Sequence, residues 1–291
     1  MMMLSMLRSL KNTMLLSSLI TTAIYADQNS DLQEYLINQI ENNPIVKQGD
    51  VKIVGKKPLK SVPGWEAYIL DVDVTLKQNN KKIHQKNIIF YNGRYVASDF
   101  IDIRSGKSLK DKIKPDFKKS MYDDKNIAVG DKNAVHRIVV FSDPLCPFCR
   151  KFVPEVIEDI KKYPKKYVLY HYNLPLTRLH PASEYIVKAE IAAELKGKKI
   201  DIYKLYTQIQ PEDPKKPNYI AYSESDPKKV LAVFNKVFGT NITLQDLSSP
   251  EVLKRYNKEK QLSDELLVAG TPTFYFDEKF DRSRKAYKKV K

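Results

Sequence analysis

Residues 136–160 read HRIVVFSDPLCPFCRKFVPEVIEDI, and three structural signals follow one another in this run. The apolar segment His136–Phe141 predicts a buried strand, and Ser142-Asp143-Pro144 predicts a turn. An apolar stripe at helical spacing comes next and consists of Phe152, Val153, Val156, Ile157 and Ile160. The order of strand, turn and helix therefore places Cys146 and Cys149 at the start of a helix.

Cys146 and Cys149 are the only cysteines in the chain. A disulfide between them closes a very short loop and would stabilise the fold by only about 2 kcal/mol before strain is subtracted. At a helix N-terminus, unpaired N–H groups and the positive dipole end stabilise a thiolate, so we assign Cys146 as the nucleophile. Cys149 lies one turn later on the same face and is the resolving thiol.

Two other interpretations of the cysteine pair are a structural disulfide and half of a zinc site. The loop argument disfavours the first. Zinc needs two further ligands, and the four histidines of the chain do not form the close pair expected opposite such a motif. We therefore interpret the pair as a redox dithiol.

The residues around the dithiol receive more modest assignments. Pro147 suits the first turn of a helix because it lacks an N–H group there. Phe148 either contacts a substrate or packs at the rim of the site. We expect Asp143 to turn the chain rather than to influence the Cys146 proton. For His180 we expect a capping or packing role, and a position near the site is the alternative.

The first residues resemble a secretory signal. Arg8 and Lys11 are positive, and Met14–Ile24 is apolar but shorter than the roughly 20 residues that span a bilayer. We predict a signal peptide over residues 1–26, with cleavage after Ala26 or, as the alternative, Ala23, and therefore export; the family resemblance given below implies that the location is periplasmic. A buried helix or a retained anchor is the alternative.

The remaining chain divides into a small α+β module over residues 27–104, a linker over 105–132 and a second domain over 133–291. The module is predicted to contain a helix and four strands: Asp31–Glu41, Val51–Val54, Trp65–Leu76, Lys82–Tyr91 and Arg94–Ile103. The second domain adds strands at Tyr167–Tyr172 and Thr273–Phe276, with a helical insert over about 177–267. Its end is predicted to be a very short strand and a short basic helix, Lys279–Asp281 and Arg282–Lys289.

The formal net charge of +15 would favour nucleic acid in a cytosolic protein. The lysines are spread along the chain, and an exported protein meets little nucleic acid, so no nucleic-acid partner is predicted. We predict no cofactor and no metal, because the dithiol itself is the redox centre.

The segment Phe141–Cys149 resembles the active site of the periplasmic disulfide isomerases of the DsbC and DsbG type, and it is closer to the DsbG form. Pro154 matches the helix-kinking proline of thioredoxin-fold proteins. Gly270-Thr271-Pro272 resembles the family's Thr–cis-Pro loop. The resemblance implies that Pro272 follows a cis bond and pairs with the substrate backbone, and that Thr271 tunes the Cys146 sulfur. An ordinary trans turn is the alternative.

The resemblance also implies an architecture and partners. The first module would be cystatin-like and would form a V-shaped homodimer, and the second domain would be thioredoxin-like and catalytic. The shortened C-terminal end departs from the family pattern. Clients would be exported proteins with cysteines, and a membrane protein, either a DsbD-like reductant or a DsbB-like oxidant, would set the redox state of the dithiol.

These features predict a thiol-disulfide oxidoreductase, and we favour a dimeric disulfide isomerase or reductase. A dimeric thiol oxidase that donates disulfides is the main alternative. A chaperone with secondary redox activity and a reductase of sulfenic acids also stay open at this stage.

Overall fold

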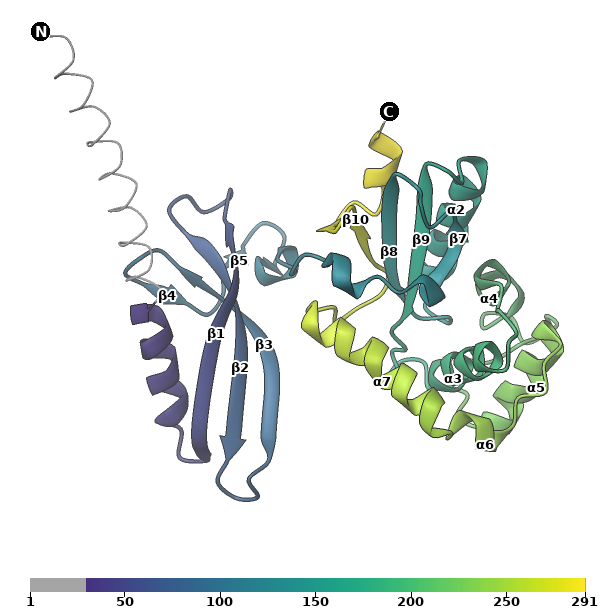
Figure 1. Cartoon of the computed structure of the whole chain (residues 1–291), viewed down its shortest axis with the longest axis horizontal. Coiled ribbons are helices and arrows are strands. Elements are labelled where there is room, and N and C mark those ends of the chain that lie inside the picture. The colour runs from purple at the N-terminus through teal and green to yellow at the C-terminus, as the bar shows by residue number, and fades with distance from the viewer. Residues whose placement is uncertain (1–29, 291) are drawn as a thin grey trace, which may run out of the picture. The chain divides into compact units, whose positions relative to one another are not determined.

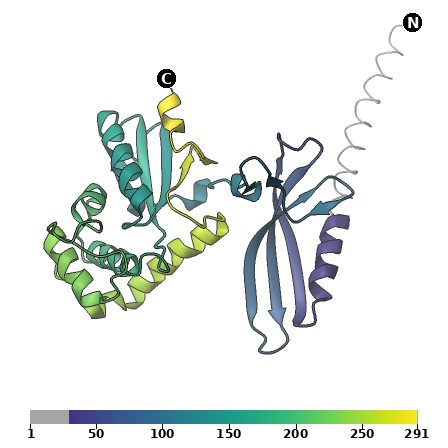
Figure 2. The same ribbon diagram turned by 180° about the vertical axis from the view of Figure 1, so that it is seen from behind.

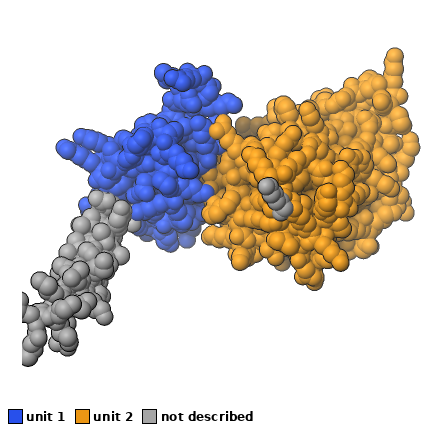
Figure 3. Space-filling view, turned by 90° about the horizontal axis from the view of Figure 1, so that it is seen from above, with its two compact units in different colours: residues 1–113 blue, residues 114–291 orange. Residues whose placement is uncertain are grey.

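The computed structural model describes residues 30–290, so the predicted signal peptide over residues 1–26 lies outside the described residues. The chain forms two compact units that divide between Ile113 and Lys114 (Figure 3). None of the helices within residues 30–290 has the length and apolar character needed to cross a bilayer.

The first unit is a helix packed on an antiparallel sheet (Figure 1). The helix covers residues 30–41. The sheet has the order β1-β2-β3-β4, with strands β1 (Val46–Pro58), β2 (Glu66–Leu76), β3 (Lys82–Tyr91) and β4 (Val96–Ala97). Leu32 of the helix packs against Val51 of β1 and Leu70 of β2 in one apolar cluster. The expected α+β content of this module is therefore present.

The predicted strand Arg94–Ile103 is wrong, because the chain turns within it. Only β4 joins the sheet, while β5 (Ile101–Asp102) pairs with β6 (Lys107–Ser108) in a separate hairpin. Asp99 explains the break, since its carboxylate accepts hydrogen bonds from the Phe100 N–H and the Ser108 hydroxyl.

The expected linker over residues 105–132 also needs correction, because the structure assigns its residues to the two units. β6 and the short helix η1 (Lys110–Lys112) precede the division at Ile113. Beyond it lie η2 (Lys119–Met121), η3 (Asp124–Asn126) and strand β7 (Ile127–Gly130). Phe117 is wholly buried in the core of the second unit.

The second unit is built on a five-stranded sheet of order β11-β10-β8-β9-β7. The strands are β7, β8 (His136–Ser142), β9 (Tyr167–Asn173), β10 (Thr273–Phe276) and β11 (Lys279–Phe280). β8 and β9 run parallel and are connected by α2 (Pro147–Lys162), and the other neighbours pair antiparallel. The last element is η4 (Ala286–Lys289), where a short helix was expected.

Alternate residues of β8 pack into two different apolar layers, as strand geometry requires. Ile138 and Val140 belong to the apolar cluster that includes residues of α2, whereas Val139 and Phe141 belong to the cluster that includes Phe117. The helix α2 lies against one face of the sheet (Figure 2). Both faces of the central strand are therefore covered, which agrees with its continuous apolar sequence.

The predicted helical insert is present between β9 and β10. Its helices are α3 (Ala182–Leu195), α4 (Ile202–Gln208), α5 (Pro227–Phe238), α6 (Leu244–Leu247) and α7 (Pro250–Glu265). They gather at the end of the sheet where β8 and β9 finish (Figure 1). The loop between α4 and α5 holds Pro211, Pro214 and Pro217, which cannot continue a helix.

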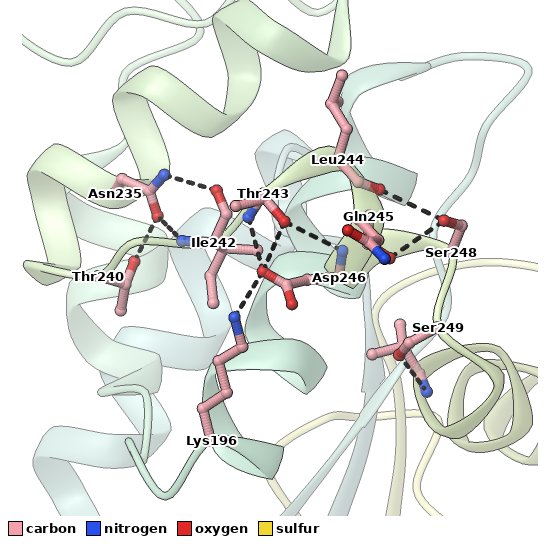
Figure 4. A network of polar contacts seen from close by, with 11 residues as sticks. Lys196, Asn235, Thr240, Ile242, Thr243, Leu244, Gln245, Asp246, Ser248 and Ser249 are labelled. Atoms are coloured by element: carbon pink, nitrogen blue, oxygen red, sulfur yellow. Dashed lines mark hydrogen bonds and ion pairs between the residues drawn. The ribbon is translucent and has the colours of Figure 1, made fainter.

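Polar caps fix the turns within the insert (Figure 4). The Asn235 side chain donates to the Ile242 carbonyl at 2.9 Å and accepts from its N–H at 2.8 Å. Thr243 caps α6, and Asp246 bonds back to the Thr243 N–H and pairs with Lys196 at 2.6 Å. These contacts tie α5, α6 and the end of α3 together.

Glu259 attaches the insert to the sheet. This wholly buried carboxylate on α7 accepts a hydrogen bond from the Asn173 N–H at 2.8 Å, at the end of β9. It also accepts from the Asn126 side chain at 3.2 Å and lies 3.4 Å from Arg255. A buried carboxylate is tolerated only with such partners.

Gly130, at the end of β7, provides a test of how closely β7 packs against β9. It has φ +96°, and a Cβ at this position would lie 2.2 Å from the Tyr167 carbonyl oxygen in β9. Gly197 has φ +83° with open space around it, so Gly197→Ala is a matched control. Both variants should suffer backbone strain of about 1–3 kcal/mol. We expect urea unfolding to show an additional loss of about 2 kcal/mol for Gly130→Ala. Equal losses would contradict the close contact between β7 and β9.

Candidate functional site

The turn between β8 and α2 is organised by Asp143, which is wholly buried. Its Oδ1 accepts hydrogen bonds from the N–H groups of Leu145 at 2.7 Å and Cys146 at 3.1 Å. Cys146 is the N-cap residue of α2, with an extended backbone, and Pro147 occupies the first turn as expected. The local sequence thus places the sulfur of Cys146 at the N-terminus of α2.

The same carboxylate reaches the start of the insert. Asp143 Oδ2 accepts a hydrogen bond from the Leu176 N–H at 2.6 Å and lies 3.3 Å from His180 Nδ1. The Ser183 hydroxyl donates to Oδ1 at 2.7 Å. Asp143 does turn the chain, as predicted, but it also joins the turn to α3.

The two thiols lie in very different environments. Hydrogen bonds from the Cys149 thiol and from the N–H groups at the helix start, together with the nearby Thr271 side chain, lower the pKa of Cys146 to about 5, although burial opposes this shift. Burial raises the pKa of Cys149 well above 9, and its bond to Cys146 adds to the effect. At neutral pH, Cys146 is therefore a thiolate and Cys149 a protonated thiol that donates to it.

The loop before β10 lies beside this pair, as the family resemblance implied. The Thr271–Pro272 peptide bond is cis. The Thr271 carbonyl oxygen is 3.6 Å from the Cys146 sulfur. The Thr271 hydroxyl is buried, and no residue of the described chain accepts or donates a hydrogen bond to it. It is available to stabilise a thiolate.

Access to the pair is through Cys146. Cys149 is wholly buried, whereas Cys146 keeps a 5% exposed fraction. Phe148 lies between them in sequence, and its side chain is 62% exposed, so it is not part of the core. Leu179 is another exposed apolar side chain, in the loop that leads to the insert. A contact between Phe148 and a substrate stays a prediction.

Sequence reasoning missed the contribution of the insert to the site. The rings of His180 and Tyr222 lie 5.3 Å apart. The hydrogen bond to Asp143 raises the pKa of His180, and the charge of Cys146 adds to this effect. Arg150 donates to the Ile209 carbonyl at 2.6 Å and so joins α2 to the end of α4. His180-Pro181 was the one signal in the sequence, because it marks the start of the insert.

Comparison with known proteins agrees with this arrangement. Residues 123–291, more than half of the chain, match the family model described as Thioredoxin. The chain belongs to the thioredoxin family. The mixed sheet with helices, the dithiol at the start of α2 and the cis-Pro272 loop all lie within the matched thioredoxin region. The search of the curated proteins found no match.

Several solved structures are similar to part of this chain at low identity. A thioredoxin-like oxidoreductase from Silicibacter pomeroyi is 21% identical, with a TM-score of 0.42, and the match covers 54% of this chain and 83% of that one. The catalytic domain of Proteus mirabilis ScsC is 20% identical, with a TM-score of 0.43, over 55% and 82%. Pseudomonas aeruginosa DsbA2 is 17% identical, with a TM-score of 0.39, over 54% and 81%.

The thioredoxin match begins at residue 123 and leaves the first unit unassigned. The cystatin-like relationship of that unit therefore stays a prediction. The DsbC and DsbG branch within the broader family also stays a prediction.

The low pKa of Cys146 predicts a pH-dependent stability of the reduced protein. Between about pH 5 and pH 9, Cys146 is ionised in the folded chain and protonated in the unfolded chain. The stabilisation is therefore complete above about pH 9 and is lost as the pH falls towards 5. Relative to Cys146→Ala, the unfolding free energy of the reduced protein should rise by about 1.4 kcal/mol per pH unit. The oxidised protein has no thiolate and should lack this slope. If the difference in unfolding free energy between the reduced protein and Cys146→Ala does not change with pH, the low pKa of Cys146 is contradicted.

The Thr271 hydroxyl predicts a second change. Thr271→Val keeps the shape of the side chain but removes the hydroxyl beside the thiolate, so the pKa of Cys146 should rise by about one unit. The measurement is the thiolate absorbance near 240 nm against pH. Thr273→Val is the control, because the Thr273 hydroxyl already donates to the Gly270 carbonyl at 2.7 Å. An equal rise in both variants would argue against a specific role for Thr271.

Proposed function

We propose that this protein is a periplasmic thiol-disulfide oxidoreductase that acts on exported proteins, and that it works as a disulfide isomerase or reductase. The observation that carries the proposal is the asymmetry of the dithiol, in which a thiolate at Cys146 that keeps a small exposed fraction is backed by a wholly buried thiol at Cys149. Such a pair attacks at one sulfur and resolves at the other. Membership of the thioredoxin family supports the same chemistry.

The reaction begins when the Cys146 thiolate attacks one sulfur of a client disulfide. A bond forms between Cys146 and that sulfur, and the client's second sulfur leaves as a thiolate. In isomerisation, another client thiolate attacks the mixed disulfide and Cys146 is released unchanged. In reduction, Cys149 loses its proton and attacks Cys146, which releases the reduced client and leaves a disulfide between Cys146 and Cys149.

The low pKa of Cys146 also favours a second candidate, thiol oxidation. A stabilised thiolate makes the reduced protein more stable and Cys146 a good leaving group, so the oxidised protein would readily give up its disulfide. In that direction a client thiolate attacks Cys146, and the client leaves with the disulfide. The direction in the cell depends on the redox state in which the protein is kept.

Location and partners complete the proposal. The signal-like residues 1–26 support export to the periplasm, where disulfides persist. We propose that the first unit forms a homodimer. A membrane protein, either a DsbD-like reductant or a DsbB-like oxidant, would return the dithiol to its working state.

Insulin reduction in the presence of dithiothreitol tests the proposed chemistry. The wild-type protein should accelerate the reaction, and Cys146→Ser should abolish the acceleration because the nucleophile is gone. When no dithiothreitol is present, reduced Cys149→Ser should instead accumulate a mixed disulfide with the client, which is visible on a non-reducing gel. Full activity of Cys146→Ser would reject the assignment. If Cys146→Ser still suppresses client aggregation, holding of clients is independent of redox chemistry.

The direction of the reaction is tested in intact cells by acid trapping and thiol alkylation. A reduced pair of Cys146 and Cys149 is expected for an isomerase or reductase. A fully oxidised pair would favour the oxidase instead.

A further inference from the structure

Resting on the proposed function, we propose that His180 is a redox-linked proton site, which binds its proton more tightly when the dithiol is reduced and, through Asp143, determines how strongly Cys146 is held as a thiolate. His180 is a positioning residue, since it acts on the sulfur through Asp143 and through its charge.

The geometry connects His180 to Cys146 by one shared carboxylate. Asp143 Oδ2 lies 3.3 Å from His180 Nδ1, and Oδ1 accepts the Cys146 N–H at 3.1 Å. Asp143 is wholly buried and His180 only 9% exposed, so water screens this pair weakly. A change in the charge of His180 therefore alters the electrostatic potential at the turn that holds the Cys146 sulfur.

The charges of Asp143, Cys146 and His180 explain why a protonated His180 favours the thiolate of Cys146. A buried Asp143 carboxylate close to Cys146 would by itself disfavour a thiolate, because two like charges repel. A protonated His180 compensates the carboxylate and removes much of this penalty. The same argument works in reverse, since the thiolate of Cys146 raises the pKa of His180 in addition to the effect of Asp143.

Within residues 30–290, the charges that act on His180 are those of Asp143 and Cys146. Tyr222, from the loop between α4 and α5, packs against its ring, and burial raises the pKa of Tyr222 so that it is neutral at physiological pH. Glu212 and Arg150 act on Tyr222 with opposite charges. Ser183 of α3 adds only a neutral hydroxyl to Asp143. Asp143 and Cys146 are therefore the charges that govern His180.

The coupling specifies where protons go when the protein oxidises a client. A client dithiol gives up two electrons and two protons and leaves as a disulfide, while the bond between the Cys146 and Cys149 sulfurs breaks. Cys149 takes one proton and Cys146 remains a thiolate. Between the two pKa values that His180 has in the oxidised and reduced protein, the second proton goes to His180; elsewhere it goes to solvent.

The first test needs no variant. NMR titration of the histidine ring signals in the full-length protein should give a lower pKa for His180 in the oxidised than in the reduced state, by about one unit. His136 is an internal control, since it also pairs with an aspartate, Asp277 at 2.7 Å, but at the opposite end of β8. Its two titration curves should superimpose. Superimposed curves for His180 would overturn the proposal.

The second test removes the charge. His180→Gln retains an amide that can donate to Asp143 but carries no charge at any pH. Binding linkage is reciprocal, so the pKa of Cys146 should rise by the same amount as the shift seen at His180. If the pKa of Cys146 rises by one unit, the reduced protein loses a tenfold stabilisation. The reduction potential of the dithiol, measured by equilibration with glutathione, should then be lower by about 30 mV. His136→Gln should change neither quantity; an unchanged Cys146 in His180→Gln would overturn the proposal.

The outcomes separate this inference from the proposed function. If the wild-type protein reduces insulin and Cys146 has a low pKa, but His180 is insensitive to the redox state, only the inference fails. If the wild-type protein shows neither insulin reduction nor a low-pKa thiolate, the proposed function fails and the inference falls with it.

Discussion

The buried carboxylate of Asp143 is the constraint on which the reactive part of this protein depends. It accepts five hydrogen bonds, from Leu145, Cys146, Leu176, His180 and Ser183. A carboxylate without exposure to water is stable only when its lone pairs are occupied in this way. The end of β8, the start of α2 and the start of α3 must therefore assemble together, and the position of the nucleophile is fixed by the same contacts that attach the insert.

Two sulfur atoms one helical turn apart acquire opposite properties from this assembly. Cys146 lies where backbone N–H groups, a thiol and a hydroxyl converge, and hydrogen bonds outweigh the cost of burying its charge. Cys149 lies behind it, where desolvation dominates and keeps its proton in place. The different roles of the two thiols thus follow from their surroundings in the fold, hydrogen bonds at Cys146 and desolvation at Cys149, since the functional group is the same.

Sequence patterns predicted those elements whose signals are local. The strands β8 and β10 and the helix α2 were placed correctly because each carries its own apolar signal. The cis bond of the Thr271–Pro272 loop was implied by the family resemblance and is present in the structure. Strand β7 was missed because its four residues lie in a polar segment and become a strand only by pairing with β9.

The wider role of Asp143 was also missed, for a different reason. Its partners Leu176, His180 and Ser183 follow it by 33 to 40 residues, and no periodicity links positions at such separations. Glu259 is a similar case, since it meets Asn126 and Asn173 only in the folded chain. The cystatin-like relationship of the first unit rested on the order of its elements, which many unrelated small domains share.

The insertion of α3 to α7 between β9 and β10 has a consequence for how the protein matures. Thr273 of β10 pairs with Phe141 of β8, and the Thr271 carbonyl approaches a sulfur 125 residues earlier in the chain. Contacts of this kind form late, because the chain must first close a long loop. A nascent chain that has emerged only as far as α2 already carries both cysteines, yet it lacks His180 and Thr271. The surroundings that hold Cys146 as a thiolate are therefore complete only when the last strands have formed.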